Sequence, residues 1–132
     1  MLAAQREAAL PPPGPKDCVF CRRTQTPVKT STHFYAQWDT RPVAKGHALV
    51  IPFRHVTSYF DLSTDEAAEL HALIKSTKTH IDSMHRPDGY NVGVNDGEWA
   101  GQTTPHLHVH ILPRYKGDVA APVGGIRRIL SR

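Results

Sequence analysis

Residues 101–114 read GQTTPHLHVHILPR, and from His106 to His110 every second residue is histidine. The residues between the histidines, Leu107 and Val109, are apolar. Alternation of this kind predicts a half-buried strand. Because positions two apart share a face of a strand, we expect three imidazoles on one face and the apolar side chains on the other.

A row of imidazoles has three interpretations. The histidines can be unrelated residues on a solvated face. They can be metal ligands, because a His-x-His pair on a strand can supply two ligands to zinc. Alternatively, the imidazoles carry the chemistry themselves, as nucleophile, orienting group and proton carrier.

Two further strands are expected before the middle of the chain. Residues 32–38 form the first, and the turn-forming segment from Asp39 to Pro42 breaks it. Residues 47–51 form the second, which Pro52 ends.

Another strand is expected at residues 90–95, with a small polar face formed by Asn91, Gly93 and Asn95. If this strand pairs with the histidine strand as a hairpin, the polar face of one continues the histidine face of the other. A glycine there admits a ligand close to the backbone. We therefore expect this face to form the floor of a polar cleft.

The longest helix is expected after Ser63. The segment from Ser63 to Glu66 is a capping box, and Pro87 and Gly89 end the helix. Its apolar stripe consists of Leu70, Leu73, Ile74, Thr77, Ile81 and Met84. This stripe should cover the apolar face of the sheet.

The length of 132 residues suits one domain. We expect residues 1–16, which include four prolines, to be a flexible tail, and residues 17–132 to form the single domain. No apolar stretch approaches the ~20 residues of a membrane helix, and no signal-peptide core precedes Pro11. We therefore expect a cytoplasmic protein without a membrane partner.

The net charge of +4 suits an anionic ligand. No lysine-rich block and no pattern of stacking aromatics is present, so we expect no nucleic-acid partner. The basic residues gather late in the chain, at Arg114, Lys116, Arg127, Arg128 and Arg132.

Cys18 and Cys21 are the two cysteines of the chain. In a reducing compartment this spacing favours a metal-binding or redox pair over a structural disulfide. A closed tetrahedral zinc site needs two more ligands, and nine histidines are available. Two reduced cysteines without metal remain an alternative.

The pattern Gln-Thr-x-x-His-x-His-x-His-x-x-Pro resembles the histidine triad superfamily of nucleotide hydrolases and transferases. Residues 38–47 and 49–55 are similar to its nucleoside-binding strand and second strand, and Asn95 stands eleven residues before His106. The resemblance covers roughly residues 17–130.

The C-terminal segment, residues 117–127, resembles that of bacterial members often called diadenosine tetraphosphate hydrolases, although Val123 stands where an arginine is expected. The resemblance implies an α+β fold, with a five-stranded antiparallel sheet and one long helix packed on one face. It also implies a homodimer.

The resemblance implies a role for each polar residue near the triad. His108 attacks the α-phosphorus of an adenosine nucleotide and forms a covalent nucleotidyl-histidine. His110 and His47 contact phosphate oxygens. The remaining nucleotide-binding residues would be Asp39, which accepts from the ribose hydroxyls, and Asn95, Gln102 and Thr103. Each of these four can instead be an ordinary polar residue of a turn or loop.

The resemblance also implies a zinc site. Zinc-carrying triad proteins pair such cysteines with a histidine after the second strand and with the first triad histidine. In this chain the ligands would be Cys18, Cys21, His55 and His106, and the zinc would be structural.

Three functions stay open on these grounds. The first is a zinc-stabilised nucleotide hydrolase acting on dinucleoside polyphosphates, nucleoside phosphoramidates or other AMP derivatives. The second is a zinc-dependent hydrolase in which the histidine row binds the catalytic metal. The third is a non-enzymatic nucleotide-binding or zinc adaptor module. In the first, Arg127 or Arg128 would contact the distal phosphates of a long substrate.

Overall fold

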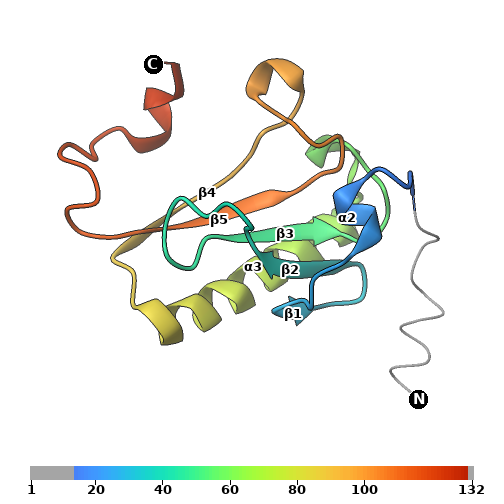
Figure 1. Ribbon diagram of the computed structural model, residues 1–132, viewed down its shortest axis with the longest axis horizontal. Coiled ribbons are helices and arrows are strands. Elements are labelled where there is room, and N and C mark those ends of the chain that lie inside the picture. Colours follow the sequence, from blue (N-terminus) through green and yellow to red (C-terminus); the bar gives the residue numbers. More distant parts are fainter. Residues whose placement is uncertain (1–13, 131–132) are drawn as a thin grey trace.

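The fold is a single antiparallel sheet with one long helix against one face (Figure 1). The computed structural model describes residues 14–130, so most of the expected tail lies outside the described residues. The strand order is β1-β2-β3-β5-β4, and every neighbouring pair is antiparallel. The strands are β1 (Lys29–Thr30), β2 (Phe34–Trp38), β3 (Ala48–Pro52), β4 (Gly89–Val94) and β5 (Val109–Arg114). This arrangement confirms the α+β prediction.

Helix α3 (Thr64–His85) begins at the predicted capping box. The Ser63 hydroxyl accepts from the Glu66 N–H over 3.1 Å, and the Glu66 carboxylate accepts from the Ser63 N–H over 2.9 Å. Two N–H groups of the first turn are thereby paired. The helix ends at Arg86, whose φ of 50° is left-handed.

Most of the predicted stripe of α3 is buried against the sheet. The prediction is wrong for Met84, which is 54% exposed. Met84 lies in the last turn, beyond the last residue of the stripe that packs in the core, Ile81. The core between α3 and the sheet consists of Phe34, Ala36, Ala48, Val50, Val56, Leu70, Leu73, Ile81, Leu107, Val109 and Ile111.

The histidine segment is more deeply buried than expected. Strand β5 begins at Val109, so His106 and His108 precede it. The Leu107 N–H donates to the Val56 carbonyl over 2.7 Å, so a loop and not a neighbouring strand pairs with this part of the chain. The predicted alternation of burial is present in β5, where Val109 and Ile111 are buried. His106 is completely buried, so the expectation that all three histidines share one open face is wrong.

The N-terminal segment covers part of the sheet face opposite α3. It contains a short helix that the sequence patterns did not predict, α2 (Val19–Arg22). A second apolar cluster lies here, formed by Cys18, Phe20, Cys21, Tyr35, Leu49, Ile51 and Phe53. The rest of this face stays open and forms the cleft described below.

Three short 3₁₀ turns complete the chain: η1 (Tyr59–Asp61), η2 (Glu98–Ala100) and η3 (Gly125–Leu130). Figure 1 shows η3 returning towards the sheet after the chain leaves β5. A Cβ built on Gly93 of β4 would lie 3.8 Å from Ile126 of η3, so η3 lies beside this strand. Within residues 14–130, no helix has the length and apolar character needed to cross a membrane.

Candidate functional site

A cavity of about 380 Å³ lies over the face of the sheet opposite α3. In the sheet register, His110 stands opposite Leu49 on one side and Gly93 on the other. The expected β4–β5 hairpin is therefore confirmed, and the Gly93 face continues the His110 face. The polar and aromatic residues that line the cavity include Phe20, Asp39, His47, Asn95, Thr103, His108 and His110.

His108 has its ring nitrogens in two different environments. Its Nδ1–H donates to the His106 carbonyl over 2.9 Å. In a neutral imidazole the other nitrogen, Nε2, then carries a free lone pair. His108 is only 8% exposed, yet it lines the cavity. Its Nε2 lone pair is therefore held in an ordered position at the cavity.

His47 and His110 form a directed hydrogen-bond chain. The Val43 N–H donates to His47 Nδ1 over 3.2 Å, so the proton of neutral His47 is on Nε2. This nitrogen lies 3.0 Å from His110 Nδ1 and donates to it. His110 therefore carries its own proton on Nε2, so its ring presents an N–H donor next to the His108 ring. The His108 and His110 rings are 5.2 Å apart.

Burial keeps these histidines neutral. It lowers the pKa of His110 to about 4, and the neighbouring His108 and His47 act in the same direction. Burial also lowers the pKa of His47, while the Asp39 carboxylate opposes this effect. The chain of tautomers therefore persists at neutral pH, because a protonated ring would have two donors and no acceptor.

Of the four residues expected to bind the nucleoside or phosphate, three line the cavity. Asp39 accepts from the Arg41 N–H over 2.9 Å and has a second oxygen 3.3 Å from His47 Nε2. Asn95 and Thr103 also line the cavity.

Gln102 lies outside the cavity lining and closes the loop before the triad. Its Oε1 accepts from the Gly97 N–H over 2.8 Å. Its Nε2 donates to the carbonyls of Thr57 and Thr104 over 3.0 and 3.2 Å. The side chain thus holds the loop that carries Asn95 and Thr103.

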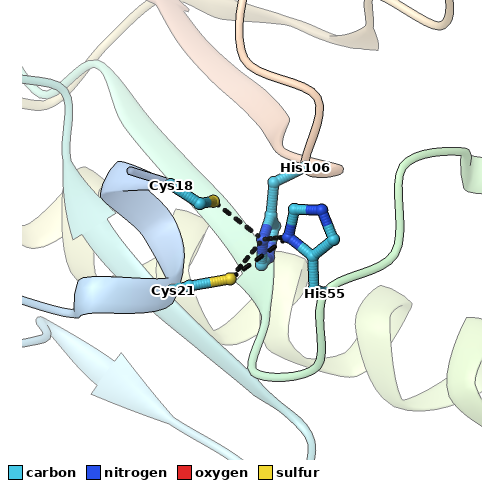
Figure 2. Close-up of side chains that lie close together, drawn as sticks. All are labelled: Cys18, Cys21, His55 and His106. Carbon is cyan, nitrogen blue, oxygen red and sulfur yellow. Dashed lines mark hydrogen bonds between the residues drawn. The ribbon is translucent and has the colours of Figure 1, made fainter. Parts of the chain in front are cut away.

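Beside the cavity, the four predicted zinc ligands converge from three segments of the chain (Figure 2). Their ligand atoms all lie within 4.8 Å of one another. His106 Nδ1 is 3.5 Å from Cys18 Sγ, 3.4 Å from Cys21 Sγ and 3.2 Å from His55 Nδ1. Ligands bound ~2.0–2.3 Å from a tetrahedral zinc ion lie about 3.3–3.8 Å apart, so the four residues fit zinc.

The tautomer of His106 suits a metal ligand. Its Nε2–H donates to the Pro52 carbonyl over 2.9 Å, which leaves the lone pair on Nδ1 facing the cysteines. Burial lowers the pKa of His106 to about 4, so the ring is neutral. His106 therefore belongs to the Cys/His cluster and does not line the cavity.

A second group, Asp39, His47 and His110, also has its donor atoms within 4.8 Å of one another. Here His47 uses Nδ1 to accept from a backbone N–H, so its Nε2 carries a proton. A metal at this position would require that nitrogen to present a lone pair. The arrangement fits a hydrogen-bond relay better than the catalytic metal site considered from the sequence.

The sequence interpretation missed the contribution of α2 to the cavity. Val19 and Phe20 of α2 line the cavity, and so do Thr24 and Gln25, which follow the helix. The Phe20 ring lies 4.9 Å from the His108 ring. The sequence held one signal for this contact. Phe20 stands between Cys18 and Cys21, so if both cysteines bind the same metal ion as His106, Phe20 must lie next to the triad.

The basic C-terminal residues do not line this cavity. Arg127 and Arg128 lie in η3, and Arg128 Nε donates to the Val123 carbonyl over 3.0 Å. Gly125 lies beside Asn91 of β4, since a Cβ built on it would be 3.5 Å from the Asn91 amide nitrogen.

Comparison with known proteins points to one family. The profile of the HIT domain matches residues 23–117. An uncharacterised HIT-like protein of Methanocaldococcus jannaschii is 36% identical over 108 residues, which cover 76% of this chain and 81% of that protein.

Two relatives with named activities are longer than this chain. A bifunctional bis(5'-adenosyl)-triphosphatase/adenylylsulfatase of Arabidopsis thaliana is 38% identical over 64% of this chain and 47% of its own length. An asymmetrical bis(5'-nucleosyl)-tetraphosphatase of Schizosaccharomyces pombe is 41% identical over 61% of this chain and 44% of its own length. The chain thus spans about half of the length of these relatives.

Solved structures agree with the sequence match. A HIT family protein of Bacillus subtilis superposes with a TM-score of 0.73 at 34% identity, over 80% of both chains. A zinc-bound histidine triad family protein of Mycobacterium smegmatis superposes with a TM-score of 0.71 at 31% identity, over 82% of both chains.

Proposed function

Because the chain belongs to the HIT domain family, we propose that it hydrolyses or transfers the nucleotidyl group of an adenosine nucleotide by attack at the α-phosphate. The observation that carries the proposal is the ordered lone pair of His108 at the cavity, beside the N–H donor of His110. The relatives named as dinucleoside polyphosphate hydrolases support a substrate of this class.

In the first step His108 Nε2 attacks the α-phosphorus, and the bond from phosphorus to the leaving oxygen breaks. The ring becomes an imidazolium, whose Nδ1–H bond to the His106 carbonyl strengthens as charge develops. Water then displaces the imidazole, the phosphorus–nitrogen bond breaks, and the proton of water is released. Splitting one displacement into two lowers the barrier of each.

The His47–His110 chain supplies a preorganised donor for the phosphate oxygens. The His47 Nε2–H donates to His110 Nδ1, which fixes the orientation of the His110 ring and of its own Nε2–H. Donors that are already oriented need no reorganisation when charge develops. We assign His110 to the phosphate and His47 to holding His110. Asp39 would accept from the ribose hydroxyls, and Asn95 and Thr103 would bind the sugar or phosphate.

We further propose that Cys18, Cys21, His55 and His106 bind one structural zinc ion. The distances among their ligand atoms support this, and so does the zinc-bound relative from M. smegmatis. Four protein ligands leave no open coordination position, so the ion would have a structural role. It would link the N-terminal segment, through Cys18 and Cys21, to His106 of the triad. Since both thiols must stay reduced to bind it, a reducing compartment such as the cytoplasm fits this role.

A second copy of the chain is proposed to pair along β4. This strand is an edge of the sheet, and Val92 on it is 43% exposed. An apolar groove of about 260 Å³ runs between α3 and β4, lined in part by Leu70 and Ile74. Unpaired edges and apolar grooves favour association. Sedimentation as a monomer at micromolar concentration would contradict the dimer.

The function is tested with His108→Ala and His108→Gly. We expect His108→Ala to lose turnover by at least about a thousandfold while it still binds AMP, because the covalent route is closed. Added imidazole should restore turnover to His108→Gly, and acid-quenched wild-type protein should carry a phosphoramidate on His108.

His33→Ala is the matched control, since this histidine is exposed and pairs with Glu69 away from the cavity. Near-normal turnover of His108→Ala would overturn the mechanism. Binding without turnover across diadenosine polyphosphates and AMP amides would favour a nucleotide-binding module, and fast loss and recovery of activity with chelator and metal would favour a catalytic metal.

A further inference from the structure

Phe20 lies between the Cys/His cluster and the proposed nucleophile. Its ring is 5.8 Å from the His106 ring, at an interplanar angle of 67°, and 4.9 Å from the His108 ring, at 46°. The side chain is 7% exposed and also lines the cavity. One aromatic ring therefore touches both a proposed zinc ligand and the residue proposed to attack phosphorus.

The backbone of Phe20 is held on both sides and from below. Cys18, the N-cap of α2, and Cys21 within the helix stand on either side of it in sequence, and both sulfurs reach His106. The Phe20 carbonyl accepts from the buried Tyr35 hydroxyl over 2.7 Å. Its ring thus has little freedom to move away from His108.

The hydrogen bond of His108 restrains only one edge of its ring. Nδ1–H donates to the His106 carbonyl, and the side chain, which also carries Nε2, lines the cavity. Combined rotations about the Cα–Cβ and Cβ–Cγ bonds can swing the ring about the Nδ1–H···O hydrogen bond, which moves Nε2 while Nδ1 stays near its acceptor. A neighbouring ring face restricts this motion, and Phe20 is the phenyl ring in contact there.

We propose that Phe20 is a positioning residue that holds the His108 ring for attack, and that Cys18 and Cys21 keep it in place. This rests on the proposed function for its kinetic consequence. Attack requires a near-attack geometry, and a displacement of about 1 Å can cost on the order of 100-fold in rate. In this proposal the Cys/His cluster has two effects. It fixes the N-terminal segment to the sheet, and through Phe20 it also sets the position of His108.

The test compares Phe20→Leu with Phe53→Leu. Phe53 is a matched control because it is buried in the same cluster and packs its ring 5.1 Å from Tyr35, with no ring contact to a triad histidine among the described residues. We expect Phe20→Leu to lower kcat and the single-turnover rate of nucleotidyl-histidine formation by at least about tenfold. KM should change less than twofold, and the bound metal should match wild type.

A second measurement does not depend on activity. Long-range ¹H–¹⁵N NMR of the zinc-loaded protein at pH 8 reports which nitrogen of each histidine is protonated. We expect the Nδ1–H form of His108 in all three proteins, with sharp signals in wild type and Phe53→Leu. In Phe20→Leu the His108 signals should be broadened, because the ring then moves while Nδ1 stays near its acceptor. This result stands even if no nucleotide is hydrolysed, so it separates failure of the proposed function from failure of this inference.

Three outcomes would overturn the inference. A rise in KM with unchanged kcat would assign Phe20 to nucleobase binding. Equal loss of metal and activity in both Leu variants would assign it to general packing of the cluster. Wild-type kinetics together with an unchanged His108 spectrum would show that the hydrogen bond alone orients the ring.

Discussion

At the scale of the residue, each histidine near the cavity owes its chemistry to the partner of one ring nitrogen. His108 gives its Nδ1–H to a carbonyl and keeps a lone pair at Nε2. His106 gives its Nε2–H to a carbonyl and keeps a lone pair at Nδ1. His47 accepts at Nδ1 and donates at Nε2. The same type of side chain is therefore suited to the three proposed roles, nucleophile, metal ligand and relay, according to which backbone group it meets.

Asp39 offers a test of the nucleoside pocket. Asp39→Ala should raise KM for adenosine nucleotides and flatten the preference for ribose over 2'-deoxyribose, because a hydrogen bond to a charged group is worth about 1.5–3 kcal/mol. The measurement is kcat/KM for matched ribo and deoxy substrates. Since Asp39 also lies beside His47, Asp39→Asn serves as the companion variant, with hydrogen bonding kept but charge removed. Unchanged sugar discrimination in Asp39→Ala would remove this residue from the pocket.

The lowered pKa of His110 predicts acid sensitivity. Its pKa is about 4 in the folded chain, against an ordinary value of 6.5. Between these values the unfolded chain binds more protons, so stability from this group is full above pH 6.5 and falls as the pH drops towards 4. Thermal unfolding from pH 7.5 to 4 should show a shallower loss of Tm in His110→Gln than in wild type. Parallel curves would mean that the neighbouring His47 and Asp39 compensate for the burial.

At the scale of the element, α2 is a short helix whose position depends on its contacts with the rest of the chain. It has four residues, and its N-cap lacks a side-chain hydrogen bond. A helix of this length is not stable by itself. Its position follows from Cys18 and Cys21, from the Tyr35 hydroxyl on the Phe20 carbonyl, and from the second apolar cluster. By contrast, α3 has its capping box and a buried stripe of its own.

The proposed zinc site is tested by one substitution that removes a ligand and by two glycine-to-alanine substitutions, one beside the site and one remote from it. Cys18→Ser should lower bound zinc from about one per chain to near zero and lower Tm by about 10 °C or more, because metal binding is coupled to folding. Gly14→Ala should act in the same direction, since its Cβ would lie 2.7 Å from Cys21 Sγ and 2.8 Å from His55 Cβ.

Gly89→Ala is the control for Gly14→Ala, because a Cβ at Gly89 meets nothing within 4 Å. Elemental analysis and thermal unfolding give both readouts. Cys18→Ser with wild-type stability, in a protein that contains no metal, would refute the site.

At the scale of the whole molecule, the cavity is built from three segments that are distant in sequence. Residues 19–25 supply one wall, residues 37–49 supply Asp39 and His47, and residues 95–110 supply the proposed nucleophile and the loop before it. The antiparallel register brings His110 beside Leu49 and Gly93, and η3 lies next to the same strand as Gly93. The basic end of the chain is thereby placed beside the open side of the sheet.

We propose that this basic segment selects long substrates. Truncation after Pro122 should reduce kcat/KM for diadenosine tetraphosphate more than for an AMP amide, which has no distal phosphates for Arg127 or Arg128 to contact. The difference should shrink at high salt, because exposed charges are screened. The double variant Arg127→Gln and Arg128→Gln separates charge from bulk. If both substrates lose the same factor, the segment does not contact phosphate.

Local patterns predicted helix α3, strands β2 to β5 and the histidine-rich character of the site, but they predicted neither α2 nor β1. The capping box at Ser63, the stripe of α3 and the period of two after His106 each depend on neighbours a few residues apart, so they can be read from spacing alone. The five-stranded sheet and the zinc ligands came from resemblance to a family, and the fold agreed.

Spacing could not assign the directions in which these side chains point. His106 leaves the row of His108 and His110 because the Val56 carbonyl pairs with the Leu107 N–H and because two cysteines 85 and 88 residues earlier in the chain meet its Nδ1. Gln102 reaches the Thr57 carbonyl, and Phe20 reaches His108, through contacts of the same long-range kind. Such contacts exist only once the sheet has assembled, because hydrogen-bond partners and burial are properties of the packed chain and not of its local periodicity.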